Sequence, residues 1–185
     1  MRRQFSMRGH TSLSRLRSLR TGTGFRAEAM HVTSTLDAVP RFQDLMPQQS
    51  DIAAADQRDW RMLLLKAYGA GFQANAARCP LLWSLIADSP LIVSASLSFL
   101  SPRKHIPRHR GPFRGILRFY MGLSVPTDDS GGPGTVLQID GVDYRLNDGE
   151  ALLWDDTYPH EVWNTQMRSG WRSYSMCVEP TCRQL

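Results

Sequence analysis

After Pro90 the chain consists of short runs of β-branched and apolar residues separated by turn residues, and this pattern restricts the fold most. Asp140-Gly141, between two of these runs, predicts a tight hairpin, and Asp148-Gly149 marks the next turn. Because no helical pattern separates the runs, an antiparallel sandwich or barrel is favoured, and a jelly roll fits best. Seven strands are expected, in the segments LIVSASLSFL, GILRFYMGLSV, TVLQI, VDYRL, EALLW, HEVWN and WRSYSMCV.

Two helices are predicted before these strands. From Asp56 to Asn75, apolar residues recur at intervals of three and four, which is the spacing of one helix face. Pro80 begins a second, short helix, LLWSLIAD, because proline suits a first helical turn, and Ser89-Pro90 ends it. Both helices are expected to pack on the outside of a sheet.

The net charge of +5 is concentrated at the N-terminus. Residues 1–29 contain seven arginines and one acid and contribute +6, whereas residues 30–185 sum to −1. This tail is a disordered basic extension, a transit-like peptide, or sequence that precedes a true start at Met30. We therefore expect an extension over 1–29, a linker over 30–55 and a folded domain over 56–182. No nucleic-acid partner is expected, because no basic patch continues beyond the tail.

Cysteine usage and hydropathy indicate the setting. The three cysteines, Cys79, Cys177 and Cys182, show no Cys-x-x-Cys spacing, so neither a disulfide framework nor a structural zinc site is indicated. A reducing, cytoplasmic location fits best. No transmembrane segment is expected, because the apolar runs are far shorter than the ~20 residues that a span requires. Peripheral contact with a membrane stays open, and the sequence does not indicate an oligomeric state.

Three histidines follow the predicted linker: His105, His109 and His160. His109 precedes the second predicted strand and His160 begins the sixth, so the open end of a two-sheet barrel can bring them together. HEVWN is not the zinc-protease motif, because Asn164 replaces its second histidine. The usual non-haem iron site adds a carboxylate two residues after the first histidine, where this chain has Gly111. From the residues alone, the pair is either an incomplete metal site or two packed histidines.

Several segments, taken in order, resemble the aspartyl/asparaginyl β-hydroxylase family: LIVSASLSFLSP, HRGPFRGILRFYMGL, LLWDDTYPHEVWN and WRSYSMCV. The resemblance covers about residues 60–180. It implies a mainly β fold, a double-stranded β-helix (a cupin-like jelly roll) with N-terminal helices packed outside. It also implies a dioxygenase that uses Fe(II), 2-oxoglutarate and O2, and that releases succinate and CO2. Bacterial members include enzymes that 2-hydroxylate acyl chains of lipid A.

The resemblance implies roles for particular residues. His109 and His160 match the two iron ligands, and Gly111 matches the family's glycine where other oxygenases carry a carboxylate. Arg172 matches the arginine that pairs with the distal carboxylate of 2-oxoglutarate, a contact that suits a planar guanidinium. Arg168 is the competing candidate for this contact.

Ser98, Arg118 and Tyr120 match positions of the cosubstrate pocket, with Tyr120 in place of the family's usual histidine. Strand alternation puts Arg118 and Tyr120 on one face of an apolar run. An arginine there indicates either an anionic partner or a solvated sheet edge. Asp155 and Asp156 are expected to orient the ligands or to cap the turn before His160.

Ile116 stands where members that act on Asp or Asn side chains tend to have a basic residue. We therefore expect a hydroxylase of an unactivated C–H bond in a lipid acyl chain, with an aspartyl or asparaginyl side chain or another small molecule as the other substrates. The alternative from another class is a catalytically inactive jelly-roll binding protein. Tyr120 and Arg103-Lys104, where the family usually has His and Pro-Gly, are the departures that favour it.

Overall fold

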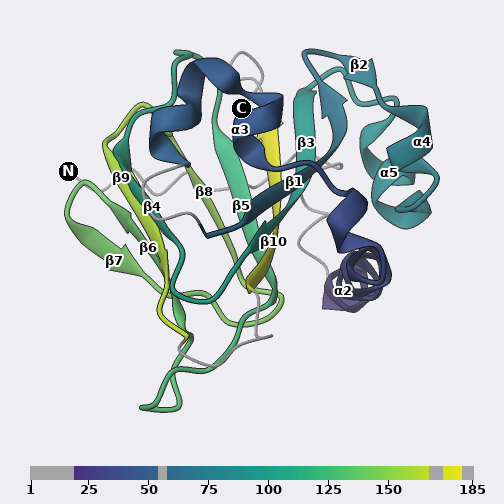
Figure 1. Ribbon diagram of the computed structural model, residues 1–185. Helices are drawn as coiled ribbons and strands as arrows, with labels where there is room; N and C mark the ends of the chain where they lie inside the picture. Colours follow the sequence, from purple (N-terminus) through teal and green to yellow (C-terminus); the bar gives the residue numbers. More distant parts are fainter. Residues whose placement is uncertain (1–18, 54–57, 167–172, 181–185) are drawn as a thin grey trace.

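Two antiparallel sheets face each other in the computed structural model, which describes residues 19–53, 58–166 and 173–180 (Figure 1). The larger sheet has the strand order β2-β1-β3-β10-β5-β8, and the smaller has the order β4-β9-β6-β7. The strands are β1 (Trp60–Ala67), β2 (Ala70–Gly71), β3 (Ile92–Leu100), β4 (His105–His109), β5 (Arg118–Ser124), β6 (Thr135–Ile139), β7 (Val142–Tyr144), β8 (Ala151–Trp154), β9 (His160–Asn164) and β10 (Ser173–Pro180).

This arrangement is a cupin-like β-sandwich, as predicted. The expected hairpin joins β6 to β7, and its central residues Asp140 and Gly141 have φ values of 48° and 81°. Positive φ at both positions matches the right-handed twist of paired strands, which explains the Asp-Gly dipeptide. Each of the seven predicted segments contains a strand, and β1, the short β2 and β4 are additional.

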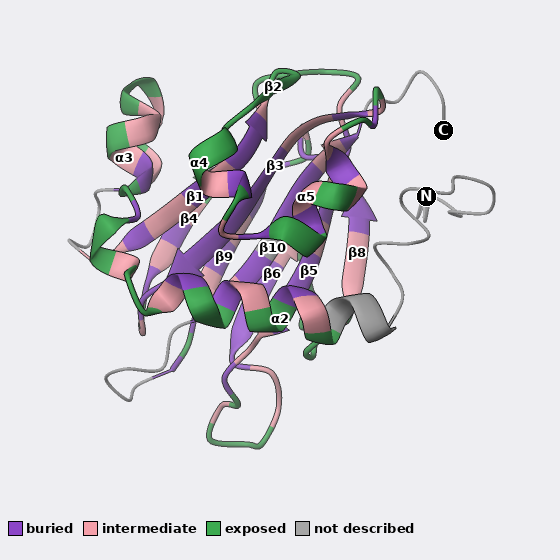
Figure 2. Ribbon diagram, turned by 90° about the vertical axis from the view of Figure 1, so that its right-hand side faces the viewer, coloured by how far each residue is buried: buried purple, intermediate pink, exposed green. Residues whose placement is uncertain are grey.

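The helices are α2 (Leu19–Thr33), α3 (Phe42–Leu45), α4 (Gln73–Ala76) and α5 (Pro80–Ile86), with 3-10 turns η1 (Leu36–Ala38) and η2 (Pro47–Ile52). Figure 2 shows α2 and α5 lying across one face of the larger sheet. The prediction of α5 is confirmed, including its start at Pro80. No helix in the described ranges is both long and apolar enough to cross a membrane.

The predicted helix over 56–75 is wrong, because most of this segment forms the strand β1 and the hairpin to β2. β1 lies inside the sheet between β2 and β3, and side chains on both of its faces are covered. Leu63 and Leu65 pack under the helices, whereas Trp60 and Met62 face the smaller sheet. A strand that is covered on both faces reads as a nearly continuous apolar run, and such a run imitates a helix face.

The predicted boundary at residue 29 is also wrong, because α2 crosses it. Phe25, Ala29 and Val32 are fully buried in the core under the larger sheet, at the spacing of one helix face. Residues 19–29 therefore belong to the folded body, and the rest of the predicted extension lies outside the described residues. The predicted linker over 30–55 carries α3 and both 3-10 turns.

Strand alternation gives the larger sheet two different faces. Residues such as Leu97, Phe99 and Phe119 form an apolar core with α2 and α5. The neighbouring positions, which include Ser96 and Ser98, face the smaller sheet. The interior between the sheets is therefore partly polar, which is unusual for a sandwich core and indicates a binding site.

Candidate metal centre and pocket

His109 and His160 lie side by side at the end of the smaller sheet. His109 is the last residue of β4 and His160 the first of β9, and the two are paired across these antiparallel strands. Their ring centroids are 4.1 Å apart, and the rings are tilted by 56°. The structure therefore brings together the two histidines that the sequence singled out. It does so through β4, a strand that was not predicted.

A backbone carbonyl fixes the orientation of each imidazole. His109 Nδ1 lies 2.8 Å from the carbonyl oxygen of Pro107, and His160 Nδ1 lies 2.9 Å from that of Tyr158. Because a carbonyl oxygen only accepts hydrogen bonds, Nδ1 carries the proton in both rings. The Nε2 lone pair of each neutral ring is then available to a metal ion. This is the usual outer hydrogen bond of a metal-ligating histidine.

Both rings are held in the neutral form. Burial lowers the pKa of His109, and the Arg118 guanidinium acts in the same direction. Burial and then the adjacent His109 lower the pKa of His160 to about 3. The two imidazoles are thus unprotonated at neutral pH, as metal ligands must be.

Asp156 packs against Gly111, the position where the usual non-haem iron site has its carboxylate. A Cβ atom added to Gly111 would lie closer than 3.0 Å to Cγ and both oxygens of the Asp156 side chain. The Gly111 amide also donates to the Asp156 carbonyl oxygen at 2.7 Å. Gly111 is therefore required by close packing against Asp156.

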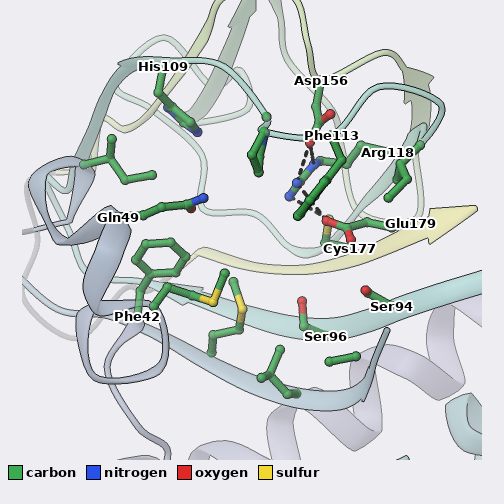
Figure 3. Close-up of a pocket in the computed structure, with 18 of the residues that line it drawn as sticks. Phe42, Gln49, Ser94, Ser96, His109, Phe113, Arg118, Asp156, Cys177 and Glu179 are labelled. Carbon is green, nitrogen blue, oxygen red and sulfur yellow. Dashed lines mark hydrogen bonds and ion pairs between the residues drawn. The ribbon is translucent and has the colours of Figure 1, made fainter. Parts of the chain in front are cut away.

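Arg118 holds this carboxylate. Its Nε and Nη2 donate to Asp156 Oδ2 at 3.1 and 2.6 Å, and Nη2 also donates to Glu179 Oε1 at 2.8 Å. Figure 3 shows the guanidinium between the two acids, with Cys177 beside it. Both anionic groups that bond Arg118 belong to the chain itself, and its predicted contact with the cosubstrate stays a prediction. Asp155 caps the turn before His160, since its Oδ1 accepts hydrogen bonds from the amide and the hydroxyl of Thr157.

The ligand set is a pair rather than a cluster. Within the described ranges, no group of three or more His, Cys, Asp or Glu side chains is placed to hold a metal ion. His105, the third histidine, belongs to another surface, because it bonds Glu161 at 3.1 Å and stacks on Trp163. Arg172 and Arg168 lie outside the described residues, so their roles stay predictions.

Ser98 and Tyr120 lie in the interior between the sheets and are not among the residues that line the pocket described below. The Ser98 hydroxyl accepts a hydrogen bond from the Trp60 indole at 2.9 Å. Tyr120 hydrogen-bonds Ser175, and burial raises the pKa of Tyr120 to about 12. Ser98 and Ser175 are paired across β3 and β10, so these groups form a buried polar strip between the sheets. Their predicted contact with the cosubstrate stays a prediction.

A pocket of about 140 Å³ opens next to the histidines. One water needs roughly 10–15 Å³ by the same measure, so the space fits a larger ligand. The pocket has a polar end at Arg118, Asp156 and Glu179, and an apolar arm that leads away from it (Figure 3). The arm is formed by α3, η2, the residue between them and β1, and its apolar residues are Phe42, Met46, Ile52, Trp60, Met62 and Leu64, with Gln49 of η2 among them.

Sequence reasoning missed most of the apolar arm. Phe42 stacks on Trp60 with ring centroids 3.7 Å apart, although the segment around it was predicted to be a linker. The i, i+4 spacing of Phe42 and Met46 before Pro47 is a short-helix signal that could have identified this wall. Nothing local could have identified Asp156 as the partner of Arg118.

The fold and the site together define a class of protein, a cupin-like sandwich with two neutral histidines at a strand end, next to a pocket. Within that class, this chain belongs to the aspartyl/asparaginyl β-hydroxylase family, since the model of the family described as "Aspartyl/Asparaginyl beta-hydroxylase" matches residues 23–171. The resemblance seen in the motifs is thereby confirmed.

Individual relatives include a lipid-modifying enzyme. The ornithine lipid ester-linked acyl 2-hydroxylase of Rhizobium tropici is 34% identical over 139 residues, covering 75% of this chain and 48% of that protein. Human aspartyl/asparaginyl beta-hydroxylase is 24% identical over 113 residues, covering 58% of this chain and 14% of that protein. The chain thus spans about half the length of the first relative and less of the second. Among solved structures, KdgF from Halomonas sp. is similar with a TM-score of 0.42 and 9% identity, covering 68% of this chain and 81% of that one.

Proposed function

We propose that this chain is an Fe(II)- and 2-oxoglutarate-dependent hydroxylase that acts on the acyl chain of a polar lipid. The observation that carries the proposal is the pair of neutral histidines, with both Nε2 lone pairs available, beside a pocket with an apolar arm. Membership of a hydroxylase family and the likeness to an acyl 2-hydroxylase support it.

The residues present fit a ferrous ion. Neutral imidazole is a suitable ligand for iron, and two protein ligands leave the remaining coordination positions for a chelating keto acid and O2. The buried Trp154 indole N–H has no partner among the described groups, and the Trp154 ring meets His160 edge-on with centroids 4.5 Å apart. An unused donor at this point suits a ligand that carries hydrogen-bond acceptors. When bound, iron and 2-oxoglutarate would supply the chemistry by which O2 is split, with one oxygen atom converting C–H to C–OH and the other entering succinate as CO2 is released.

The chain's own residues would hold the iron and orient the cosubstrate. His109 and His160 would ligate the iron through Nε2, each fixed by its carbonyl partner. Asp156 is bonded to Arg118 and packed against Gly111, so it would not serve as a metal ligand, and positions that the two histidines do not fill would be left to the cosubstrate. Arg172 is proposed to pair with the distal carboxylate of 2-oxoglutarate.

The pocket favours an acyl chain over an Asp or Asn side chain. Ile116 lines the pocket, and the arm from Phe42 to Leu64 gives a chain of methylene groups an apolar surface. A substrate carboxylate would need a cation, but Arg118 already bonds two carboxylates. Arg110, the other cation on the described pocket wall, is exposed and donates to the Thr157 carbonyl oxygen.

The test is turnover of an ester-linked acyl lipid, with ornithine lipid as the first substrate. The purified chain is incubated with Fe(II), 2-oxoglutarate and the lipid in detergent micelles, and the products are analysed by mass spectrometry. We expect one added oxygen per lipid and an equal amount of succinate. His109→Ala and His160→Ala should abolish both products, whereas the matched control His105→Ala, on the same strand but outside the site, should not.

The alternative, an inactive binding protein, predicts a different result. Such a protein would bind 2-oxoglutarate without forming succinate on any substrate. Oxygen added to an Asp- or Asn-containing peptide, with none added to lipid, would retain the hydroxylase and refute the acyl-chain substrate.

A further inference from the structure

Two exposed aromatic side chains, Tyr68 and Phe113, line the pocket, and a third, Phe72, follows Tyr68 on the same exposed segment. The segment Tyr68-Gly69-Ala70-Gly71-Phe72, which contains the β1–β2 turn and leads to α4, consists of exposed residues and carries no charge. Tyr68 is 68% exposed, Phe72 is 42% exposed, and Phe113 on the loop between β4 and β5 is 48% exposed. Tyr68 and Phe113 meet edge-on with ring centroids 6.0 Å apart. We call Tyr68, Phe72 and Phe113 the aromatic rim.

The structure holds the rim outward. The amide of Gly69 donates to the Val93 carbonyl oxygen and that of Phe72 to the Leu65 carbonyl oxygen, which ties both ends of the hairpin to the sheet. Tyr68 has a φ of 49°, a conformation that is rare for a bulky residue. Gly69 follows with a φ of 85°, and positive φ at both residues is the ordinary geometry of a two-residue hairpin turn, so the turn between β1 and β2 accounts for this conformation.

The rim is continuous with the apolar arm. Tyr68 and Phe113 line the pocket together with Ile116 and Leu64, so a chain that leaves the pocket passes directly over these two rings. Single exposed apolar residues are ordinary, but a group at the mouth of an apolar pocket indicates an interaction surface.

The charged residues on the segments that carry the rim are positive, and the two acids of the pocket wall, Asp156 and Glu179, are paired with Arg118. Arg110 and Arg114 flank Phe113, and both are exposed. The sequence contains no acidic residue between positions 60 and 87, or between 105 and 127, which include the segments that carry the rim. Aromatic rings beside arginines are the composition that favours the interface of an anionic bilayer, where the rings enter the headgroup region and the cations meet phosphate.

We propose that the aromatic rim docks this protein on the surface of a bilayer that contains anionic phospholipid, so that an acyl chain enters the pocket directly from the membrane. The inference rests on the proposed function, because it names the source from which the acyl substrate is taken. Direct entry keeps the chain out of water, since the rim bridges the bilayer and the apolar arm.

The test is co-sedimentation of the full chain with phospholipid vesicles, without iron or 2-oxoglutarate. We expect binding to vesicles of equimolar phosphatidylcholine and phosphatidylglycerol, and weaker binding to phosphatidylcholine alone. The double variant Tyr68→Ser/Phe113→Ser should lower the partition coefficient by about tenfold, because two interfacial side chains are lost. Phe72→Ser, which changes a residue outside the pocket wall, should lower it by a smaller factor and serves if the double variant does not fold.

Val142→Ser is the matched control. Val142 is 47% exposed on β7, at the edge of the smaller sheet, whereas the hairpin of the rim lies at the edge of the larger one (Figure 1). This variant should bind vesicles as the wild type does. Docking is overturned if the wild type binds neither vesicle, if the rim variants bind as well as Val142→Ser, or if the rim variants only dissociate a dimer of this chain.

Vesicle binding and turnover can fail separately. Binding through the rim without turnover of micellar lipid would retain the docking surface and remove the proposed function. Turnover in micelles without vesicle binding would do the reverse.

Discussion

A methyl group added at Gly111 should disrupt the site through Asp156. The new Cβ would lie closer than 3.0 Å to three atoms of the Asp156 carboxyl group, so the carboxylate must rotate away. Rotation breaks the bonds that Arg118 Nε and Nη2 make to Oδ2. Hydrogen bonds to charged groups contribute about 1.5–3 kcal/mol each.

The structure sets the size of the effect. Arg118 retains Glu179 and its side chain is 27% exposed, so the loss is smaller than the sum of two buried bonds. We expect Gly111→Ala to lower the free energy of unfolding by about 2–4 kcal/mol and Asp156→Ala to lower it by about 2–3 kcal/mol. In the double variant the clash is gone, and the Arg118 bonds are lost only once. Its destabilisation should therefore be smaller than the sum of the single variants by about 2 kcal/mol.

The assay is urea unfolding of the metal-free protein, followed by circular dichroism, for the wild type and the three variants. The slope of the unfolding free energy against urea concentration must be the same in all four proteins, so that a shift of the unfolding midpoint reports a change in stability alone. Additive single effects, within about 0.5 kcal/mol, would refute the direct contact between Gly111 and Asp156.

Three further predictions concern stability. A chain that begins at Met30 loses the fully buried Phe25, and this loss alone costs about 3–5 kcal/mol of stability. The melting temperature of this shortened chain should therefore lie well below that of a chain that begins at Leu19. Equal melting temperatures would show that α2 is dispensable. The pKa of His160 is about 3 in the folded chain and 6.5 in the unfolded chain, so only the unfolded chain binds a proton there between these pH values. The free energy of unfolding should therefore fall as the pH falls from 6.5 towards 3, by up to about 1.4 kcal/mol per pH unit. In urea titrations His160→Asn should lose less stability over this range, and an identical loss would contradict the lowered pKa. Lys66 Nζ caps the end of α5 by donating to the carbonyl oxygens of Ile86, Ala87 and Ser89. Lys66→Met should therefore lower the free energy of unfolding by about 2–3 kcal/mol. An unchanged thermal melt would exclude a stabilising role for this cap.

The strands after Pro90 were predictable because each carries its own signal. In β5, Phe119 and Met121 face the core whereas Arg118 and Tyr120 face the other sheet, and turn residues bound the run. β1 gives no such signal, because it is covered on both faces. α2 was obscured by its composition: its core residues have helical spacing, but they are set among arginines and glycines that are typical of a disordered tail.

In the candidate site, too, one part was predictable from the sequence and another was not. The histidine pair was predictable because family motifs surround both residues, and each ring is fixed by a carbonyl two positions earlier in the chain. The contact of Arg118 with Asp156 joins residues 38 positions apart, and the apolar arm joins α3 to β1. Such contacts follow from how the strands are paired, which no local pattern encodes.

The central claim is that His109 and His160 together hold iron for a 2-oxo acid. The most direct measurement is anaerobic addition of Fe(II) and 2-oxoglutarate to the purified chain, with detection of the weak visible charge-transfer band of a chelated 2-oxo acid. The band should form in the wild type and in His105→Ala, and should be absent from His109→Ala and His160→Ala. A wild type without the band, or either site variant with it, would contradict the account.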